Sequence, residues 1–198
     1  MIKVGLTGGI GAGKSWIAKI FQNLGVPIYN ADLRSKEILF NSEIVHTEIK
    51  NKIGENVFTN GIPDRKKLAD IVFNDQEKLA ILNSILHPKV KEDYEKWLVE
   101  NATAPYTIKE AAILFETGIY KFSDKNILVT APKSIRIERV KKRDNTSQEE
   151  IESRMNKQWD DEKKIPLADL VIVNDGKQAI LSKILDFHER LINQLEEK

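Results

Sequence analysis

The chain has 198 residues, no cysteine, and 31 basic against 30 acidic side chains, which gives a formal net charge of +1. This length suits one ordinary domain with small inserts, and the balanced charge is not typical of proteins that bind nucleic acid or membranes. Without cysteine, disulfides and thiolate metal sites are excluded. The sequence has no leader-like N-terminus and no apolar run of about 18 residues, so we expect a cytoplasmic protein.

Short apolar runs alternate with amphipathic segments along the chain, a pattern typical of βαβ units and a parallel sheet. The first strand is predicted over 2–7, and it leads through a loop into a helix that Gly25 ends. Further strands are predicted at 26–29, 107–115, 126–130 and 170–173, and a closing helix over 180–195. The pattern therefore predicts an α/β fold with a five-stranded parallel sheet.

Two intervals between predicted strands are too long for simple crossovers. Residues 30–106 predict a helical insert, in which Asp75 caps one helix and Pro88 ends or kinks it before a new start at Val90. A second helical insert precedes the last strand, and its Ser147 and Glu150 have the spacing of a capping box.

Residues 6–15, LTGGIGAGKS, contain the pattern GxxxxGKS between a predicted strand and a predicted helix, which is the context of a phosphate-binding P-loop. Backbone amides of such a loop converge on phosphate oxygens. The expected nucleotide contacts are Gly9, Ile10, Gly11, Ala12, Gly13, Lys14 and Ser15. Lys14 is expected to reach the β and γ phosphates of ATP and to act in catalysis, and the Ser15 hydroxyl to bind Mg²⁺.

Among P-loop proteins, a small-molecule kinase fits the chain better than a GTPase or a motor-type ATPase. Neither Asp-x-x-Gly nor Asn-Lys-x-Asp occurs, so the guanine-reading motif is absent. The third predicted strand ends at Glu116, where motor-type ATPases carry an acidic residue. Glu116 is expected to bind Mg²⁺ through water, to help hold the acceptor, or to cap the strand.

Kinases also need a carboxylate for the acceptor hydroxyl and cations for the transferring phosphoryl group. Asp32, just after the second strand, is the predicted carboxylate, with helix capping as the alternative. Arg136, Arg139 and Arg143 share one face of a predicted helix. Their spacing suits either a closing lid or a solvated basic face.

Together these motifs resemble the dephospho-CoA kinase family across nearly the whole chain. The resemblance is carried by LTGGIGAGKS at 6–15, NAD at 30–32, a helical stretch at 60–90 with Arg65 and the string ILHP, LFE at 114–116, IERVKKRD at 137–144, RMNKQ at 154–158 and ADLVIVNDG at 168–176. It implies a three-layer P-loop kinase fold with a nucleotide-binding core at 1–30, 102–132 and 165–198. The helical acceptor-binding insert would span 31–101, and the lid 133–164.

The resemblance implies transfer of the ATP γ-phosphoryl group to the 3′-hydroxyl of dephospho-CoA, the last step of coenzyme A biosynthesis. It implies the following roles: Asp32, Lys14 and Arg139 in catalysis, Arg143 and Asn174 at ATP, and Thr7, Asp32, Arg65, His87 and Glu116 at the acceptor or its surroundings. His87 equally suits a buried spacer, and the turn at 174–176 a plain strand-to-helix connection. The chain departs from the family at Asn30, where Asp is common, and at Trp16.

Two other functions are compatible with the same motifs. A nucleoside or nucleotide monophosphate kinase would share the loop, the lid and the fold, but the long helical insert is oversized for a mononucleotide. A non-catalytic nucleotide-binding module would have no need of Lys14, Ser15, Asp32 and Arg139 together. The sequence does not determine the oligomeric state.

Overall fold

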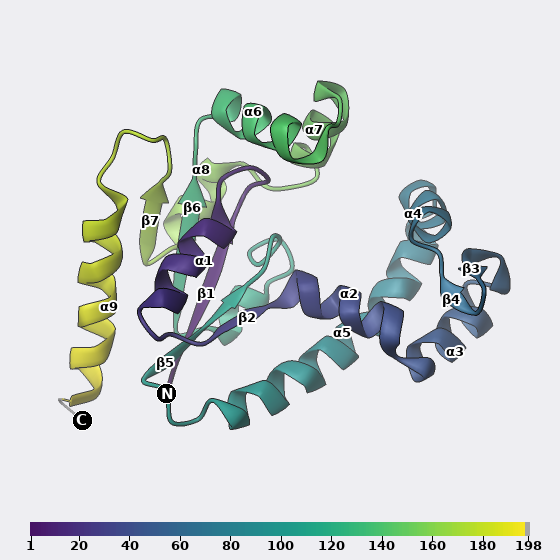
Figure 1. Cartoon of the computed structure of the whole chain (residues 1–198), viewed down its shortest axis with the longest axis horizontal. Coiled ribbons are helices and arrows are strands. Elements are labelled where there is room, and N and C mark those ends of the chain that lie inside the picture. The colour runs from purple at the N-terminus through teal and green to yellow at the C-terminus, as the bar shows by residue number, and fades with distance from the viewer. Residues whose placement is uncertain (197–198) are drawn as a thin grey trace. The chain divides into compact units, whose positions relative to one another are not determined.

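The computed structural model describes residues 1–196, apart from the side chains of Phe73, Leu195 and Glu196. The chain forms two compact units, one of Met1–Asn30 with Asn101–Lys198 and one of Ala31–Glu100. Figure 1 shows a sheet with its helices in the first unit and helices with a short hairpin in the second.

The first unit contains a five-stranded parallel sheet with the strand order β2-β5-β1-β6-β7. Its strands are β1 (Ile2–Gly8), β2 (Ile28–Asn30), β5 (Tyr106–Glu110), β6 (Lys125–Thr130) and β7 (Leu170–Val173). The predicted α/β fold is thereby confirmed. The chain turns to one side of β1 for β2 and β5 and to the other side for β6 and β7, so the carboxyl end of β1 is a topological switch point, where ligands bind in such folds.

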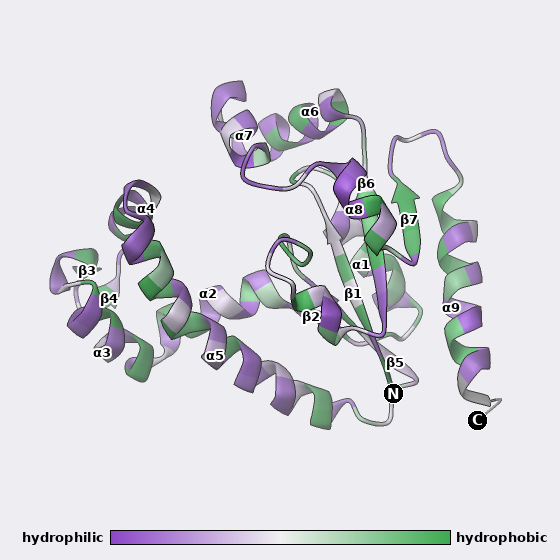
Figure 2. Ribbon diagram, turned by 180° about the vertical axis from the view of Figure 1, so that it is seen from behind, coloured by the Kyte–Doolittle hydropathy of each residue, from purple (hydrophilic) through white to green (hydrophobic). Residues whose placement is uncertain are grey.

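Helices α1 (Lys14–Asn23) and α9 (Ile180–Glu196) cover one face of this sheet. The rings of Phe21 and Phe187 meet edge to face, with centroids 6.5 Å apart. Green and purple alternate along α9 in Figure 2, as expected for a helix with one buried face. Gly25, with φ of +84°, follows the C-terminus of α1, as the sequence predicts.

The opposite face of the sheet is covered by the segment after β5, which includes the 3₁₀ turn η2 (Ile119–Phe122). The prediction of a strand over 107–115 was wrong beyond Glu110, because the chain leaves the sheet there. Leu114 and Phe115 are buried all the same, at 0% and 1% exposure. An apolar run that folds back over a sheet has the same composition as a strand, so periodicity alone does not separate them.

Four short elements join β6 to β7 within the first unit. They are α6 (Lys133–Asp144), α7 (Gln148–Met155), α8 (Asp161–Lys164) and η3 (Ile165–Leu167). The Ser147 hydroxyl accepts a hydrogen bond from the Glu150 N–H at 3.3 Å, which confirms the predicted cap. The Glu150 carboxylate accepts instead from the hydroxyl of Thr146.

The second unit is helical and has its own apolar core. Its elements are α2 (Ala31–Asn41), α3 (Glu43–Lys52), η1 (Glu55–Val57), β3 (Phe58–Thr59), β4 (Ile62–Pro63), α4 (Arg65–Asn74) and α5 (Gln76–Glu100). Asp75 caps α5 as predicted, since its Oδ1 accepts from the Lys78 N–H at 3.0 Å. No helix of the described residues is both long and apolar enough to cross a membrane.

Pro88 was predicted to end or kink the helix before a new start at Val90, and the predicted end was wrong, because α5 continues through Pro88 to Glu100. A proline inside a helix costs about 3 kcal/mol. Leu82, Ile85 and Leu86 are buried against the neighbouring helices of the unit, and each such burial contributes about 1.5–3 kcal/mol. Packing therefore outweighs the local effect of the proline.

Candidate active site

The loop between β1 and α1 has the backbone of a phosphate-binding loop. Gly11 and Gly13 have φ of +78° and +97°, which side chains other than glycine rarely adopt. The loop closes on itself through the Ala12 N–H, which donates to the Gly9 carbonyl at 3.0 Å. Helix α1 begins at Lys14, so the positive end of its dipole lies at the loop. The predicted strand–loop–helix context is confirmed.

A cavity of about 170 Å³ opens beside this loop. Its lining consists of Gly11, Gly13, Lys14, Ser15, Trp16, Arg139, Val140 and Arg143. Two of the three predicted lid arginines, Arg139 and Arg143, thus line the cavity beside the loop. Within the part of the chain that the structure describes, the buried NH1 of Arg139 has no hydrogen-bond partner. A buried guanidinium nitrogen with an unsatisfied donor, beside a glycine-rich loop at the start of a helix, suits a bound anion.

The other cations of the site already have partners. Lys14 Nζ donates to the Gly8 carbonyl at 2.8 Å, so the lysine side chain lies back over the loop. Arg143 lies at the exposed rim and binds both carboxylate oxygens of Asp144, at 2.7 and 2.9 Å. These bonds hold the pKa of Asp144 below its ordinary value. Arg136 turns to the loop itself, where its Nε donates to the Ile10 carbonyl at 2.9 Å.

Ser15 is oriented by an acidic residue that the sequence analysis missed. Its hydroxyl donates to Glu110 Oε1 at 2.9 Å, and the Asn30 side-chain amide donates to Oε2 of the same carboxylate at 2.9 Å. Glu110 is the last residue of β5 and is only 5% exposed. The acidic residue at this strand end is therefore Glu110 and not Glu116. A correct end for the strand would have revealed it.

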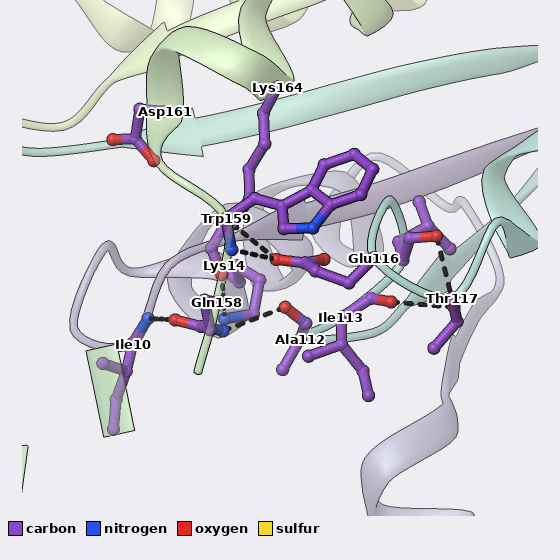
Figure 3. Close-up of polar contacts among 12 residues, drawn as sticks. Ile10, Lys14, Ala112, Ile113, Glu116, Thr117, Gln158, Trp159, Asp161 and Lys164 are labelled. Carbon is purple, nitrogen blue, oxygen red and sulfur yellow. Dashed lines mark hydrogen bonds and ion pairs between the residues drawn. The ribbon is translucent and has the colours of Figure 1, made fainter. Parts of the chain in front are cut away.

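Glu116 lies beyond the strand and takes part in a buried ion pair (Figure 3). Its Oε1 lies 2.9 Å from Nζ of Lys164, which is fully buried, although the angles are not those of a hydrogen bond. The same oxygen accepts from the Trp159 N–H at 3.0 Å. The alternative that Glu116 caps the strand was wrong. Its bonds are to the segment that leads from α7 to β7.

Two further predicted residues lie at the loop. Asn174 follows β7, and its Nδ2 donates to the Ala12 carbonyl at 2.8 Å, while its Oδ1 accepts from Arg139 NH2 at 3.5 Å. Its side chain thus joins the loop to Arg139. Thr7 lies on β1 just before the loop and is fully buried, with no partner for its hydroxyl among the described residues.

The remaining predicted residues belong to the helical unit. Asp32 is exposed in the first turn of α2, and Arg65 is exposed at the start of α4. His87 is exposed in the middle of α5, so the alternative of a buried spacer was wrong. No cluster of three or more His, Asp or Glu side chains suited to a metal ion occurs in the described part of either unit.

Comparison with known proteins agrees with this geometry. The family model described as dephospho-CoA kinase matches residues 2–179. The chain belongs to the dephospho-CoA kinase family. A dephospho-CoA kinase of Bacteroides fragilis is 36% identical over 185 residues, covering 93% of this chain and 90% of the relative. One of Aquifex aeolicus is 40% identical over 177 residues, covering 89% and 90%.

Solved structures of similar proteins cover nearly the whole chain. The crystal structure of TT1252 from Thermus thermophilus superposes with a TM-score of 0.84 at 31% identity, covering 98% of this chain and 97% of that one. The dephospho-CoA kinase from Campylobacter jejuni superposes with a TM-score of 0.70 at 26% identity, covering 97% and 98%. The resemblance expected from the sequence motifs is confirmed.

Proposed function

We propose that this family member transfers the γ-phosphoryl group of ATP to the 3′-hydroxyl of dephospho-CoA, with Mg²⁺ as the metal. The observation that carries the proposal is the unpartnered, buried NH1 of Arg139 beside the loop cavity. The names of the relatives supply the acceptor. The cysteine-free chain is compatible with the cytoplasm as the compartment.

The loop fits the phosphates of ATP. Because Gly13 has no side chain, Asn174 can lie directly against its backbone, where a Cβ would collide. The next residues, Lys14 and Ser15, form the first turn of α1, whose N-terminal amides suit phosphate oxygens. In the proposal the loop from Gly9 to Ser15 holds the phosphates through its amides other than those of Ile10 and Ala12, which stay bonded to Gln158 and to the Gly9 carbonyl. Lys14 leaves the Gly8 carbonyl to contact the β and γ phosphates. Arg139 binds the phosphoryl group as negative charge spreads over its oxygens. Arg143 and Asn174 assist at the nucleotide.

Ser15 and Glu110 fit a magnesium ion. A hydroxyl held by a buried carboxylate supplies the hard oxygen donors that Mg²⁺ prefers, with phosphates and waters completing its shell. When bound, the ion neutralises phosphate charge. Glu110 keeps the Ser15 oxygen oriented, and Asn30 keeps Glu110 in place.

Asp32 is the proposed acceptor carboxylate. It accepts the proton of the 3′-hydroxyl while that oxygen bonds to the γ-phosphorus and the bond from phosphorus to the β–γ bridging oxygen breaks, which releases ADP. Arg65 and His87, both exposed on the helical unit, are proposed contacts of dephospho-CoA. Thr7 and Glu116 are proposed to lie at the acceptor or in its surroundings.

The proposal is tested by ADP release with ATP and Mg²⁺, comparing dephospho-CoA with AMP, CMP and adenosine, and by mass spectrometry of the product. We expect release with dephospho-CoA and a product heavier by one phosphoryl group. Asp32→Asn should lower kcat by about 10²- to 10⁴-fold while ADP still binds. Asp70→Asn, an exposed aspartate of α4, is the matched control and should keep full activity.

Two outcomes would contradict the proposal at different points. Preference for AMP, CMP or adenosine would replace the acceptor and leave the phosphate loop assignment standing. Full activity of a folded Asp32→Asn variant would remove Asp32 from the mechanism.

A further inference from the structure

The tip of the phosphate loop is held on both sides of Ile10 by residues that are distant in sequence. The Ile10 N–H donates to Gln158 Oε1 at 2.8 Å, as Figure 3 shows. The Ile10 carbonyl accepts from Arg136 Nε at 2.9 Å. Arg136 lies on α6, and Gln158 follows α7, so both come from the elements between β6 and β7.

This loop needs an external constraint because its own sequence provides little. Glycines occupy positions 8, 9, 11 and 13, and glycine restricts the backbone less than any other residue. A Cβ at Gly9 would collide with the Arg136 guanidinium, and one at Gly11 with the Arg136 backbone. The glycines therefore let Arg136 lie close against the tip. Its guanidinium also lies 3.7 Å from the carboxylate of Asp161.

The side-chain amide of Gln158 makes a second hydrogen bond, on the side away from the loop. Its Nε2 donates to the Ala112 carbonyl, just after β5, at 3.1 Å. The next residue, Trp159, donates its N–H to the Glu116 carboxylate, which pairs with buried Lys164. A glutamine amide has an acceptor and a donor at one end of one side chain, and here each has a backbone partner. Gln158 thus links the loop tip to the segment behind β5 (Figure 3).

We propose that Gln158 is a positioning residue that acts together with Arg136 on Ile10, and that this double contact sets the phosphate loop in its binding shape before the nucleotide arrives. The cavity lining starts at Gly11, directly after the held residue. The orientation of the Ile10 peptide groups therefore determines where the following amides point. The inference rests on the proposed kinase function for its effect on the reaction, but not for its effect on nucleotide binding.

Preorganisation of this kind affects both binding and rate. A loop that must order itself loses affinity, because the conformational entropy is then removed on binding. A small error in the position of the γ phosphate also lowers the rate of transfer, by up to about 10²-fold for about 1 Å.

The test compares Gln158→Met, which keeps the length of the side chain and removes both hydrogen bonds, with Gln148→Met. Gln148 is exposed on α7, and its hydrogen bonds are to Lys141 and Glu152, so the control makes the same change away from the loop. We expect Gln158→Met to weaken ADP binding by about tenfold in calorimetry and to speed amide hydrogen exchange at Ile10. The amides of β1 should keep their protection.

In kinase assays, Gln158→Met should raise KM for ATP and lower kcat by about 10- to 100-fold, with KM for dephospho-CoA changed by less than about twofold. A merely structural role would lower thermal stability without this split. Unchanged ADP affinity and unchanged exchange at Ile10 in the folded variant would overturn the proposal. Loss of ADP affinity in a protein that does not phosphorylate dephospho-CoA would support the positioning role and contradict the proposed function.

A second pair of variants covers the case that Gln158→Met does not fold. Arg136→Met removes the contact to the Ile10 carbonyl, and Lys133→Met removes an exposed charge from the same helix without touching the loop. Faster exchange at Ile10 in Arg136→Met alone supports the proposal. Equal exchange in both variants overturns it.

Discussion

Substitution of Gly13 by alanine separates backbone strain from a specific collision. Gly13 has φ of +97°, and a non-glycine residue in a left-handed conformation costs about 1–2 kcal/mol. The added Cβ would also collide with Asn174 Nδ2. Asn174 would then have to leave the carbonyl of Ala12, which is buried, and a buried polar group without a partner costs about 1–3 kcal/mol. Gly13→Ala should therefore lose about 2–5 kcal/mol of the free energy of unfolding.

Gly25→Ala is the matched control. Gly25 has φ of +84°, but among the described residues no atom beyond its two chain neighbours lies within 4 Å of its added Cβ. Only the strain remains, about 1–2 kcal/mol. Urea denaturation of both variants measures the difference, and titration with ADP should show at least about tenfold weaker binding for Gly13→Ala alone, equivalent to 1.4 kcal/mol. Equal stabilities of the two variants, with equal ADP affinity, would refute the argument from the Asn174 collision.

Three further changes test the buried charges. Glu110→Gln should reduce the free energy of unfolding by about 1–3 kcal/mol in urea denaturation, because a glutamine amide has one acceptor oxygen where the carboxylate has two, so either Ser15 or Asn30 loses its acceptor. It should also raise the Mg²⁺ concentration for half-maximal activity, and an unchanged Mg²⁺ requirement would contradict the role of Glu110. Lys164→Met should lower the free energy of unfolding by about 3–5 kcal/mol, because it leaves Glu116 buried without its cation. The double variant with Glu116→Gln should regain most of this stability in urea denaturation. No recovery would show that loss of the ion pair is not the cause. Burial raises the pKa of Asp161, against the opposing effect of Arg136, so folding stability should fall as pH rises from the ordinary value of 3.8 through the raised pKa. Asp161→Asn should remove this fall in denaturation curves measured across that pH range, and an identical slope in both proteins would contradict the assignment.

The sequence by itself predicted the features that depend on neighbours within a few residues. The GxxxxGKS loop, the stop at Gly25 and the caps at Ser147 and Asp75 all occur as predicted. Each is a turn or cap whose hydrogen bonds close over about three or four residues, so the local residue types specify it. The five strands of the parallel sheet followed from the alternation of apolar and amphipathic segments, which indicates burial on a sheet, whereas the short hairpin of β3 and β4 was not predicted.

Local signals failed where burial came from distant parts of the chain. Pro88 marks a helix end in isolation, but α5 continues because its apolar residues pack within the helical unit. The run after Glu110 has the composition of a strand, yet it folds over the sheet. The error at the strand end moved the acidic residue from Glu110 to Glu116.

Only the tertiary structure decided which polar groups meet at the site. Ser15 and Glu110 are 95 residues apart, and Ile10 and Gln158 are 148 residues apart. The string RMNKQ marked Gln158 as part of a family pattern without indicating its partner, because a glutamine amide can bond to any donor and acceptor within reach. The parallel order of β5, β1 and β6 brings these segments to one edge of the sheet, and that order results from the packing of the whole unit.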